Sequence, residues 1–183
     1  KKLHIELNEK IEKRISEFKK ISPQNKKRFV SELIFCLLTP QSKAKICWKC
    51  VETLIKKDIE NINENELSLL LKGVRFNRKK SRYILEALKK VRNEKMIKKI
   101  IEMNNDFERR KWLVNNIKGY GYKEASHFLR NIGYGDELSI LDRHILKNLL
   151  KLKVINIIPA NLNRKVYIDI ENRMKKFLSL IHI

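Results

Sequence analysis

Lys123 is the residue whose type and position most strongly suggest chemistry. It follows the run Gly119-Tyr120-Gly121 directly and lies in the first turn of a helix expected to extend to Ile132. A cation at the start of a helix opposes the helix dipole, so lysine is a poor structural choice there. The same positive helix end disfavours the charged amine, and a neutral amine is what nucleophilic attack on carbon requires. The alternative is a solvated surface lysine in a lysine-rich chain.

Asp142 is the second candidate for chemistry, nineteen residues after Lys123. It follows the apolar pair Ile140-Leu141 and precedes an amphipathic helix, so it is well placed to cap that helix. A capping carboxylate can also stabilise developing positive charge, and the two roles are compatible. His144 comes two residues later, where it could contact a phosphate, face solvent or pack in the core.

The segment Lys118-Gly119-Tyr120-Gly121 predicts a tight hairpin between two helices. Two glycines one residue apart allow positive φ and close approach to a partner. The helix that starts there has backbone N–H groups without helical partners, and such groups bind phosphate without reading a base sequence. A plain helical hairpin with no ligand is the alternative for this pattern.

The net charge indicates a polyanionic partner. Lys and Arg total 42 against 21 Asp and Glu, which gives a formal net charge of +21. The stretch from Lys72 to Lys99 holds twelve basic residues, opposed only by Glu86 and Glu94. Nucleic acid is the commonest polyanion inside cells, so we expect a nucleic-acid partner. A biased composition, rich in Ile and Asn as well, is the alternative.

Other bulk features narrow the class of protein. No apolar run approaches the ~18 residues of a membrane span, and the charged start at Lys1-Lys2 differs from a secretory signal, so we expect a cytoplasmic protein. The three cysteines cannot all pair, which favours a reducing compartment. Cys47-x-x-Cys50 resembles half a metal site, but it falls in an apolar-periodic stretch without a second pair of ligands. We therefore expect core thiols, no metal and no cofactor.

Helical spacing of apolar residues dominates the chain and predicts an all-α fold. Caps are expected from Ser22-Pro23, Ser42, Asn63 with Glu66, Asp106 and Asp142, and Thr39-Pro40 and Gly73 are expected to end helices. The run Val154 to Ile158 is the one short strand-like stretch. The apolar stripes that carry the helix prediction are Ile11–Phe18, Phe29–Leu37, Cys47–Ile55, Leu67–Leu71, Tyr83–Val91, Trp112–Leu113, Ala125–Ile132, Ile145–Leu150 and Val166–Phe177.

Taken together, these residues resemble a known family. The run from Gly119 to Lys123, followed by Gly133-Tyr134-Gly135 and Asp142, resembles the helix-hairpin-helix (HhH-GPD) DNA glycosylase superfamily, and the order of lysine and aspartate is that of its bifunctional members. Gly73-Val74-Arg75-Phe76 before a lysine-rich helix resembles the archaeal, second type of 8-oxoguanine DNA glycosylase. The resemblance extends from about Phe29 to Lys176.

The resemblance implies a fold of two helical lobes with a DNA cleft between them. One lobe would comprise residues 1–40 with 141–183, and the other would comprise residues 41–140 with the helix-hairpin-helix at about 112–132. The partner would be double-stranded DNA that contains an oxidised base, bound by a monomer without cofactor or metal.

The resemblance also implies roles for single residues. Lys123 would attack C1′, form a Schiff base and lead to β-elimination, with Asp142 stabilising the positive charge on the sugar. Phe76 would stack on the flipped base. The implied DNA contacts are Lys118, Gly119, Gly121, His144 and, inserted into the duplex from the run Leu38 to Ser42, Gln41.

Two departures and two alternatives remain. The cysteines that bind the iron–sulfur cluster of the endonuclease III branch are absent after Pro159, which argues against that branch. The sequence ends at Ile183, where the resembled branch continues into a tail that helps bind the base, so we expect a shortened chain or a different recognition. The alternatives are a glycosylase for oxidised pyrimidines and a noncatalytic helix-hairpin-helix domain, which would need the glycines but not Lys123 with Asp142.

Overall fold

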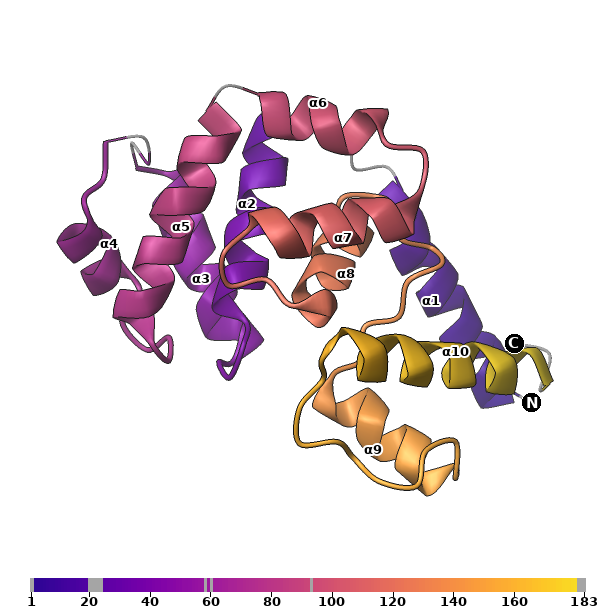
Figure 1. Cartoon of the computed structure of the whole chain (residues 1–183). Coiled ribbons are helices and arrows are strands. Elements are labelled where there is room, and N and C mark those ends of the chain that lie inside the picture. The colour runs from indigo at the N-terminus through magenta and orange to yellow at the C-terminus, as the bar shows by residue number, and fades with distance from the viewer. Residues whose placement is uncertain (1, 20–24, 58, 60, 93, 181–183) are drawn as a thin grey trace. The chain divides into compact units, whose positions relative to one another are not determined.

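The computed structural model describes residues 2–19, 25–57, 59, 61–92 and 94–180. Within these residues the regular secondary structure is all α-helix (Figure 1). The all-α prediction is therefore confirmed, and the strand-like run Val154 to Ile158 is irregular backbone. The ten helices are α1 (Lys2–Lys19), α2 (Lys26–Leu38), α3 (Ala44–Ile55), α4 (Glu64–Leu70), α5 (Asn77–Arg92), α6 (Lys95–Glu102), α7 (Asp106–Asn116), α8 (Tyr122–Asn131), α9 (Arg143–Lys151) and α10 (Arg164–Leu180).

The chain divides into two compact units, Lys1–Asp136 and Glu137–Ile183. The first unit contains α1 to α8 and the second contains α9 and α10. The assignment of residues 1–40 and 141–183 to one lobe concerns how the units associate, and it stays a prediction. None of the helices in the described residues is both long enough and apolar enough to cross a membrane.

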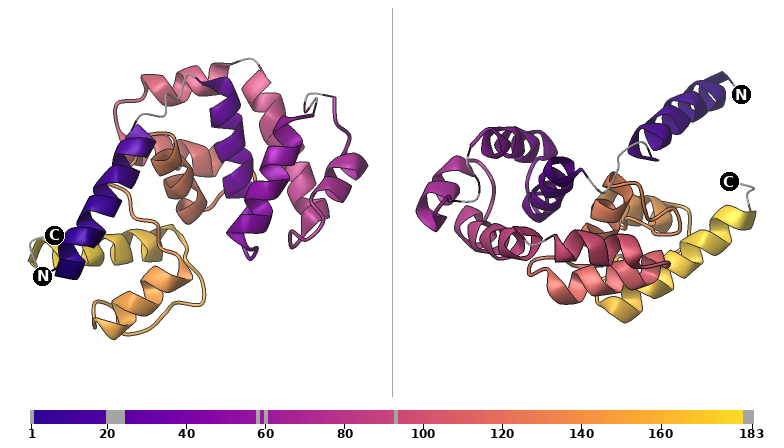
Figure 2. Two further views of the ribbon diagram at one scale, coloured as in Figure 1. Left: turned by 180° about the vertical axis from the view of Figure 1, so that it is seen from behind. Right: turned by 90° about the horizontal axis from the view of Figure 1, so that it is seen from above.

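Helix α2 is the centre of the first unit. It packs against α3, α5 and α8, and the views from behind and from above show these neighbours around it (Figure 2). A helix surrounded in this way must be apolar on nearly every face, and α2 is buried almost continuously from Phe29 to Leu38. Phe29 meets Phe128 of α8 edge to face, with ring centroids 5.0 Å apart. This contact holds the second half of α8 close to the first turn of α2.

Several cap predictions are confirmed and others are wrong. Asn63 caps α4 by accepting the backbone N–H of Glu66, and Asp142 caps α9. Ser42 is not the cap of α3, because that position is Lys43 and the Ser42 hydroxyl has tertiary partners instead. The predicted cap Asp106 is wrong as well, because the cap of α7 is Asn105, whose side chain accepts two backbone N–H groups of that helix. Ser22-Pro23 lies outside the described residues, and α2 begins at Lys26 with Asn25 as its cap.

The three cysteines are free, buried thiols. Cys36 lies on α2, and Cys47 and Cys50 lie on α3 and contribute to the same core. Burial raises the pKa of all three thiols.

Candidate active site

The hairpin between α7 and α8 is built around Gly119. Its φ of +94° lies in the left-handed region, which residues other than glycine rarely adopt. A Cβ at this position would lie 2.4 Å from Cδ2 of Tyr83, so the ring of an α5 side chain also excludes any other residue. Gly121 differs, because its φ of −99° and ψ of −174° are extended backbone open to any residue. The expectation of positive φ thus holds for one of the two glycines.

The hairpin is fixed to both of the helices that flank it. The Tyr120 hydroxyl donates to the carbonyl of Leu33 on α2 at 3.0 Å, and burial raises the pKa of this phenol well above its usual value. On the other side, Lys118 Nζ lies 3.1 Å from Glu86 Oε1 on α5, with both side chains well exposed. The backbone that precedes Lys123 is therefore held by a buried hydrogen bond and a close glycine contact.

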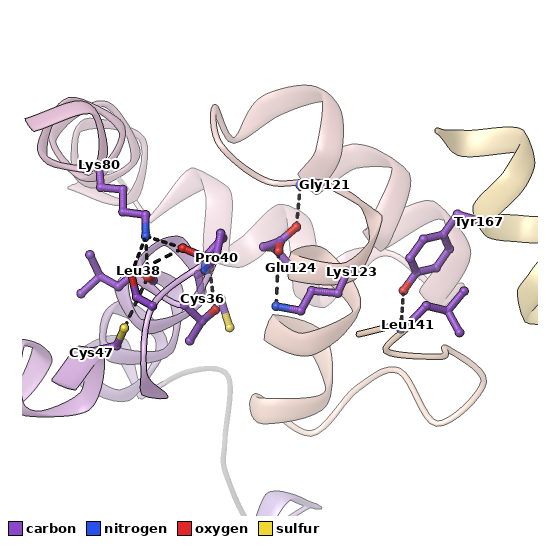
Figure 3. A network of polar contacts seen from close by, with 12 residues as sticks. Cys36, Leu38, Pro40, Cys47, Lys80, Gly121, Lys123, Glu124, Leu141 and Tyr167 are labelled. Carbon is purple, nitrogen blue, oxygen red and sulfur yellow. Dashed lines mark hydrogen bonds and ion pairs between the residues drawn. The ribbon is translucent and has the colours of Figure 1, made fainter. Parts of the chain in front are cut away.

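Lys123 lies in the first turn of α8, as the sequence predicts. Its side chain is 23% exposed, and its Nζ lies 3.3 Å from Oε1 of Glu124 (Figure 3). The other oxygen of Glu124 accepts the backbone N–H of Gly121 at 3.2 Å. Glu124 therefore holds both the hairpin and the lysine. Sequence analysis missed this residue, although a glutamate three positions after a helix cap is a known capping signal.

The start of α8 keeps amide groups that no cap side chain satisfies. Its N-cap residue is Gly121, which has no side chain to accept the N–H groups of the first turn. An anion that approaches this end meets these donors together with the positive end of the helix dipole. The Gly121 N–H itself is occupied by Glu124, so the later amides of the turn are the ones suited to a phosphate.

Asp142 caps α9 in the second unit. Its Oδ1 accepts the backbone N–H groups of His144 and Ile145, both at 2.8 Å. Capping thus engages one oxygen of the carboxylate and leaves the side chain half-buried at the start of the helix. His144 is exposed in the first turn of α9, which excludes a core role for it.

The segment before Asp142 is held against α10 by buried hydrogen bonds. The Tyr167 hydroxyl donates to the Ser139 carbonyl at 2.7 Å. It also accepts the Leu141 N–H at 3.2 Å (Figure 3). Glu171 accepts the Ser139 N–H at 2.7 Å. These bonds fix the irregular backbone from Ser139 to Leu141, so the position of Asp142 within its unit is set by α10.

A second cluster in the first unit surrounds Lys80, a residue that sequence analysis did not single out. Lys80 is on α5 and is 5% exposed. Its Nζ donates to the carbonyls of Leu38 and Pro40, each at 2.7 Å (Figure 3). It also donates to the hydroxyl of Ser42 at 3.2 Å. The turn that it binds contains Gln41, which is exposed and has a φ of +56°.

Phe76 lies in the link between α4 and α5, directly before α5 begins. It is 53% exposed, so it is not a core residue, and its φ is +60°. The guanidinium of Arg75 lies 5.1 Å from the centre of its ring. An exposed aromatic held by a neighbouring cation can stack on a planar ligand.

The predicted site residues are distributed over both units. Lys118, Gly119, Gly121, Lys123, Gln41 and Phe76 belong to the first unit, and Asp142 and His144 belong to the second. The joint action of Lys123 and Asp142 therefore stays a prediction.

Comparison with known proteins gives consistent matches along nearly the whole chain. A family model described as 8-oxoguanine DNA glycosylase matches residues 11–183. An 8-oxoguanine DNA glycosylase/AP lyase of Fusobacterium nucleatum is 42% identical over 192 aligned positions, which cover 100% of this chain and 86% of that protein.

Two solved structures are similar as well. The Methanocaldococcus jannaschii 8-oxoguanine glycosylase/lyase in complex with 15mer DNA containing 8-oxoguanine has a TM-score of 0.84 and 37% identity, covering 97% of this chain and 84% of that one. The 8-oxoguanine DNA glycosylase of Thermotoga maritima has a TM-score of 0.85 and 31% identity, covering 98% and 85%.

Proposed function

The chain belongs to the 8-oxoguanine DNA glycosylase family, and from this premise we propose that it removes 8-oxoguanine from double-stranded DNA and then cleaves the strand. The observation that carries this proposal is the placement of Lys123. Its amine is partly exposed at the start of α8, directly after a hairpin that is held rigidly on α2 and α5. Nucleophilic attack needs such a fixed yet accessible group.

The chemistry begins with the amine of Lys123. The neutral nitrogen attacks C1′, the bond from C1′ to the base breaks, and the base leaves with the bonding electrons and takes up a proton. Glu124, 3.3 Å from Nζ, is a carboxylate that can take the proton lost from the lysine. The resulting amine adduct opens to a Schiff base, and loss of a proton from C2′ then expels the 3′ phosphate. The strand is cut without any group from outside the protein.

Asp142 supplies negative charge in this scheme. Positive charge develops on the sugar as the base leaves, and a fixed carboxylate lowers the energy of that state. The buried bonds of Ser139 and Leu141 to α10 keep the carboxylate in place within its unit. We infer that the two units bring Asp142 and Lys123 to the same sugar.

Contacts to DNA come from the helix starts and from the basic surface. The first-turn amides of α8 bind a phosphate near the flipped nucleotide, with Lys118 and the backbone at Gly119 beside it. His144, exposed at the start of α9, contacts a second phosphate. Because the net charge is +21, affinity for undamaged duplex should fall steeply with salt, as counterion release requires.

The damaged base is held outside the duplex. Phe76 stacks on it, which contributes about 1–3 kcal/mol per base, and the side chain of Gln41 fills the gap that the base leaves. Both residues are exposed and both stand at positions of positive φ. We also propose that a monomer carries out the reaction in the cytoplasm, where DNA is accessible to it; sedimentation with and without a duplex tests the monomer.

Borohydride trapping together with single-turnover excision tests the proposed function. Duplexes that carry 8-oxoguanine, thymine glycol or only normal bases are compared, with wild type and Phe76→Ala. We expect trapping and fastest excision on 8-oxoguanine, and a reduced rate for Phe76→Ala. Faster release of thymine glycol would assign the enzyme to oxidised pyrimidines, and binding without any trapping would make the chain a noncatalytic DNA-binding protein.

A further inference from the structure

Lys80 is a buried cation whose hydrogen bonds all end on neutral oxygen atoms. Its partners are two backbone carbonyls and one hydroxyl. Burial of a charge costs free energy, and burial lowers the pKa of this amine. Its three bonds offset part of that cost, and each of them ends on the turn from Leu38 to Ser42. The residue is therefore better explained by what it positions than by what it adds to folding.

The side chain of Lys80 fixes the turn that contains Gln41. Leu38 ends α2, where carbonyls lack helical partners and carry the negative end of the dipole, so a cation binds well there. Pro40 and Ser42 flank Gln41 on either side, and both bind Nζ. A left-handed conformation costs a non-glycine residue about 1–3 kcal/mol. The lysine therefore holds Gln41 in a backbone conformation that it would otherwise leave.

The same residue is also bonded to the segment that carries Phe76. The backbone N–H of Lys80 donates to the carbonyl of Phe76 at 3.0 Å. In addition, Ser42 accepts the N–H of Arg75 at 3.0 Å, so the Gln41 turn and the Phe76 segment are joined directly. One hydrogen-bond network centred on Lys80 thus holds the turn around Gln41 and the carbonyl of Phe76, two positions with positive φ.

We propose that Lys80 is a positioning residue that sets the distance between Gln41 and Phe76. By fixing this distance, it allows Gln41 to fill the gap in the duplex while Phe76 stacks on the extruded base. This inference rests on the proposed function. Lys80 is not a second nucleophile, because a lysine has three donor protons and no acceptor when charged, and three oxygens take all of them. Its effect on the reaction passes through the two residues that it holds.

The test compares two reactions of the same protein. Excision of 8-oxoguanine requires extrusion and stacking of a base, whereas cleavage at a preformed abasic site has no base to extrude. Lys80→Met keeps the unbranched chain, shortened by one atom, and removes the hydrogen bonds of Nζ. We expect single-turnover excision to fall by about 100-fold, the usual result of a displacement near 1 Å, and abasic-site cleavage to stay within a few-fold of wild type.

Matched variants keep the test decisive. Lys79→Met removes one charge of the neighbouring, exposed lysine of α5, which has no bond to the turn from Leu38 to Ser42, so any effect should be equal in the two reactions and disappear at saturating enzyme. Ser42→Ala removes a single hydroxyl from the network and should reduce excision alone, by about tenfold, even if Lys80→Met fails to fold. Fluorescence of 2-aminopurine beside the lesion should report weaker extrusion in both network variants.

Two results would overturn the inference. Equal losses in excision and abasic-site cleavage would show that Lys80 only stabilises the fold, and unchanged excision would show that the separation it sets does not matter. A wild-type enzyme that cleaves abasic sites but excises no 8-oxoguanine would refute the proposed substrate instead, so failure of the two proposals is distinguishable.

Discussion

Lys123 and Lys80 lie in the same unit and differ in what surrounds the amine. Lys80 is almost completely buried and gives its protons to three neutral oxygens. Lys123 is partly exposed and lies near one carboxylate, that of Glu124 (Figure 3). The first arrangement engages every donor of the amine and holds it in place, whereas the second leaves the amine accessible to a ligand. Burial alone therefore does not identify a reactive lysine; the number and kind of its hydrogen-bond acceptors does.

The largest effect is expected from Lys123→Gln. Glutamine cannot form a Schiff base, so trapping on 8-oxoguanine duplex should fall by more than about 10⁴-fold while lesion binding persists. The measurement is borohydride trapping beside a gel-shift titration. Lys80→Met, tested in parallel on abasic sites, should still be trapped. Normal trapping of Lys123→Gln would remove Lys123 as the nucleophile.

Asp142→Asn should give the next largest effect. Asparagine is as good an N-cap as aspartate, so the midpoint of urea unfolding should barely move. Excision should slow by about 2–4 kcal/mol of activation free energy, as for a lost electrostatic stabiliser. Single-turnover rates on 8-oxoguanine duplex measure this. An unchanged rate would leave Asp142 with capping alone, and Lys123 would have to act without it.

Gly119→Ala tests the contact between the hairpin of Lys123 and the helix of Lys80. The new methyl group would lie 2.4 Å from the Tyr83 ring at a φ of +94°, so we expect a loss of about 1–3 kcal/mol in the free energy of unfolding. Gly121→Ala is the matched control, because its φ is −99° and its nearest neighbour is the flexible end of Glu124 at 3.0 Å. Equal losses in the two variants would contradict this account.

Glu32→Gln should have the smallest effect, visible only as a pH dependence. Glu32 on α2 forms an ion pair with Arg28 at 2.7 Å and accepts a hydrogen bond from Asn131 of α8 at 2.7 Å. It therefore links α8, which carries Lys123, to α2, whose end is bound by Lys80. Burial raises its pKa from the ordinary 4.5, partly offset by Arg28. The folded state therefore keeps this proton to higher pH than the unfolded state does, and stability falls as pH rises from about 4.5 through the folded pKa.

The variant has no such proton and should not show this fall. Its free energy of unfolding, relative to wild type, should therefore increase as pH rises across that window. Urea unfolding at constant ionic strength and a series of pH values measures the difference. A difference that stays constant with pH would mean that Glu32 does not titrate in this range.

The sequence predicts features that depend on local chemistry. The helices follow from the spacing of apolar residues, and the caps at Asn63 and Asp142 follow because their side chains bind amides two or three residues away. Lys123 was identifiable for the same reason, since glycines mark the start of its helix. These interactions form within one turn, so neighbouring residues determine them.

Features that depend on distant partners were predicted poorly. Ser42 has the composition of a cap, yet its hydroxyl accepts from Arg75, 33 residues away. Lys80 looks like the lysines around it, and only packing of α5 against the end of α2 distinguishes it, through bonds that span 40 residues or more. The boundary that places Lys123 and Asp142 in different units also depends on how the helices pack, and not on neighbouring residues.

The buried thiols have a consequence for handling this enzyme. Thiolates react with oxidants and alkylating reagents, and burial disfavours the thiolate of Cys36, Cys47 and Cys50 alike. Oxidants of the kind that damage guanine should therefore react slowly with these thiols while the protein stays folded. Maleimide labelling of the fully buried Cys36 and Cys47 requires α2 or α3 to open, so its rate measures how often the core of the first unit is exposed.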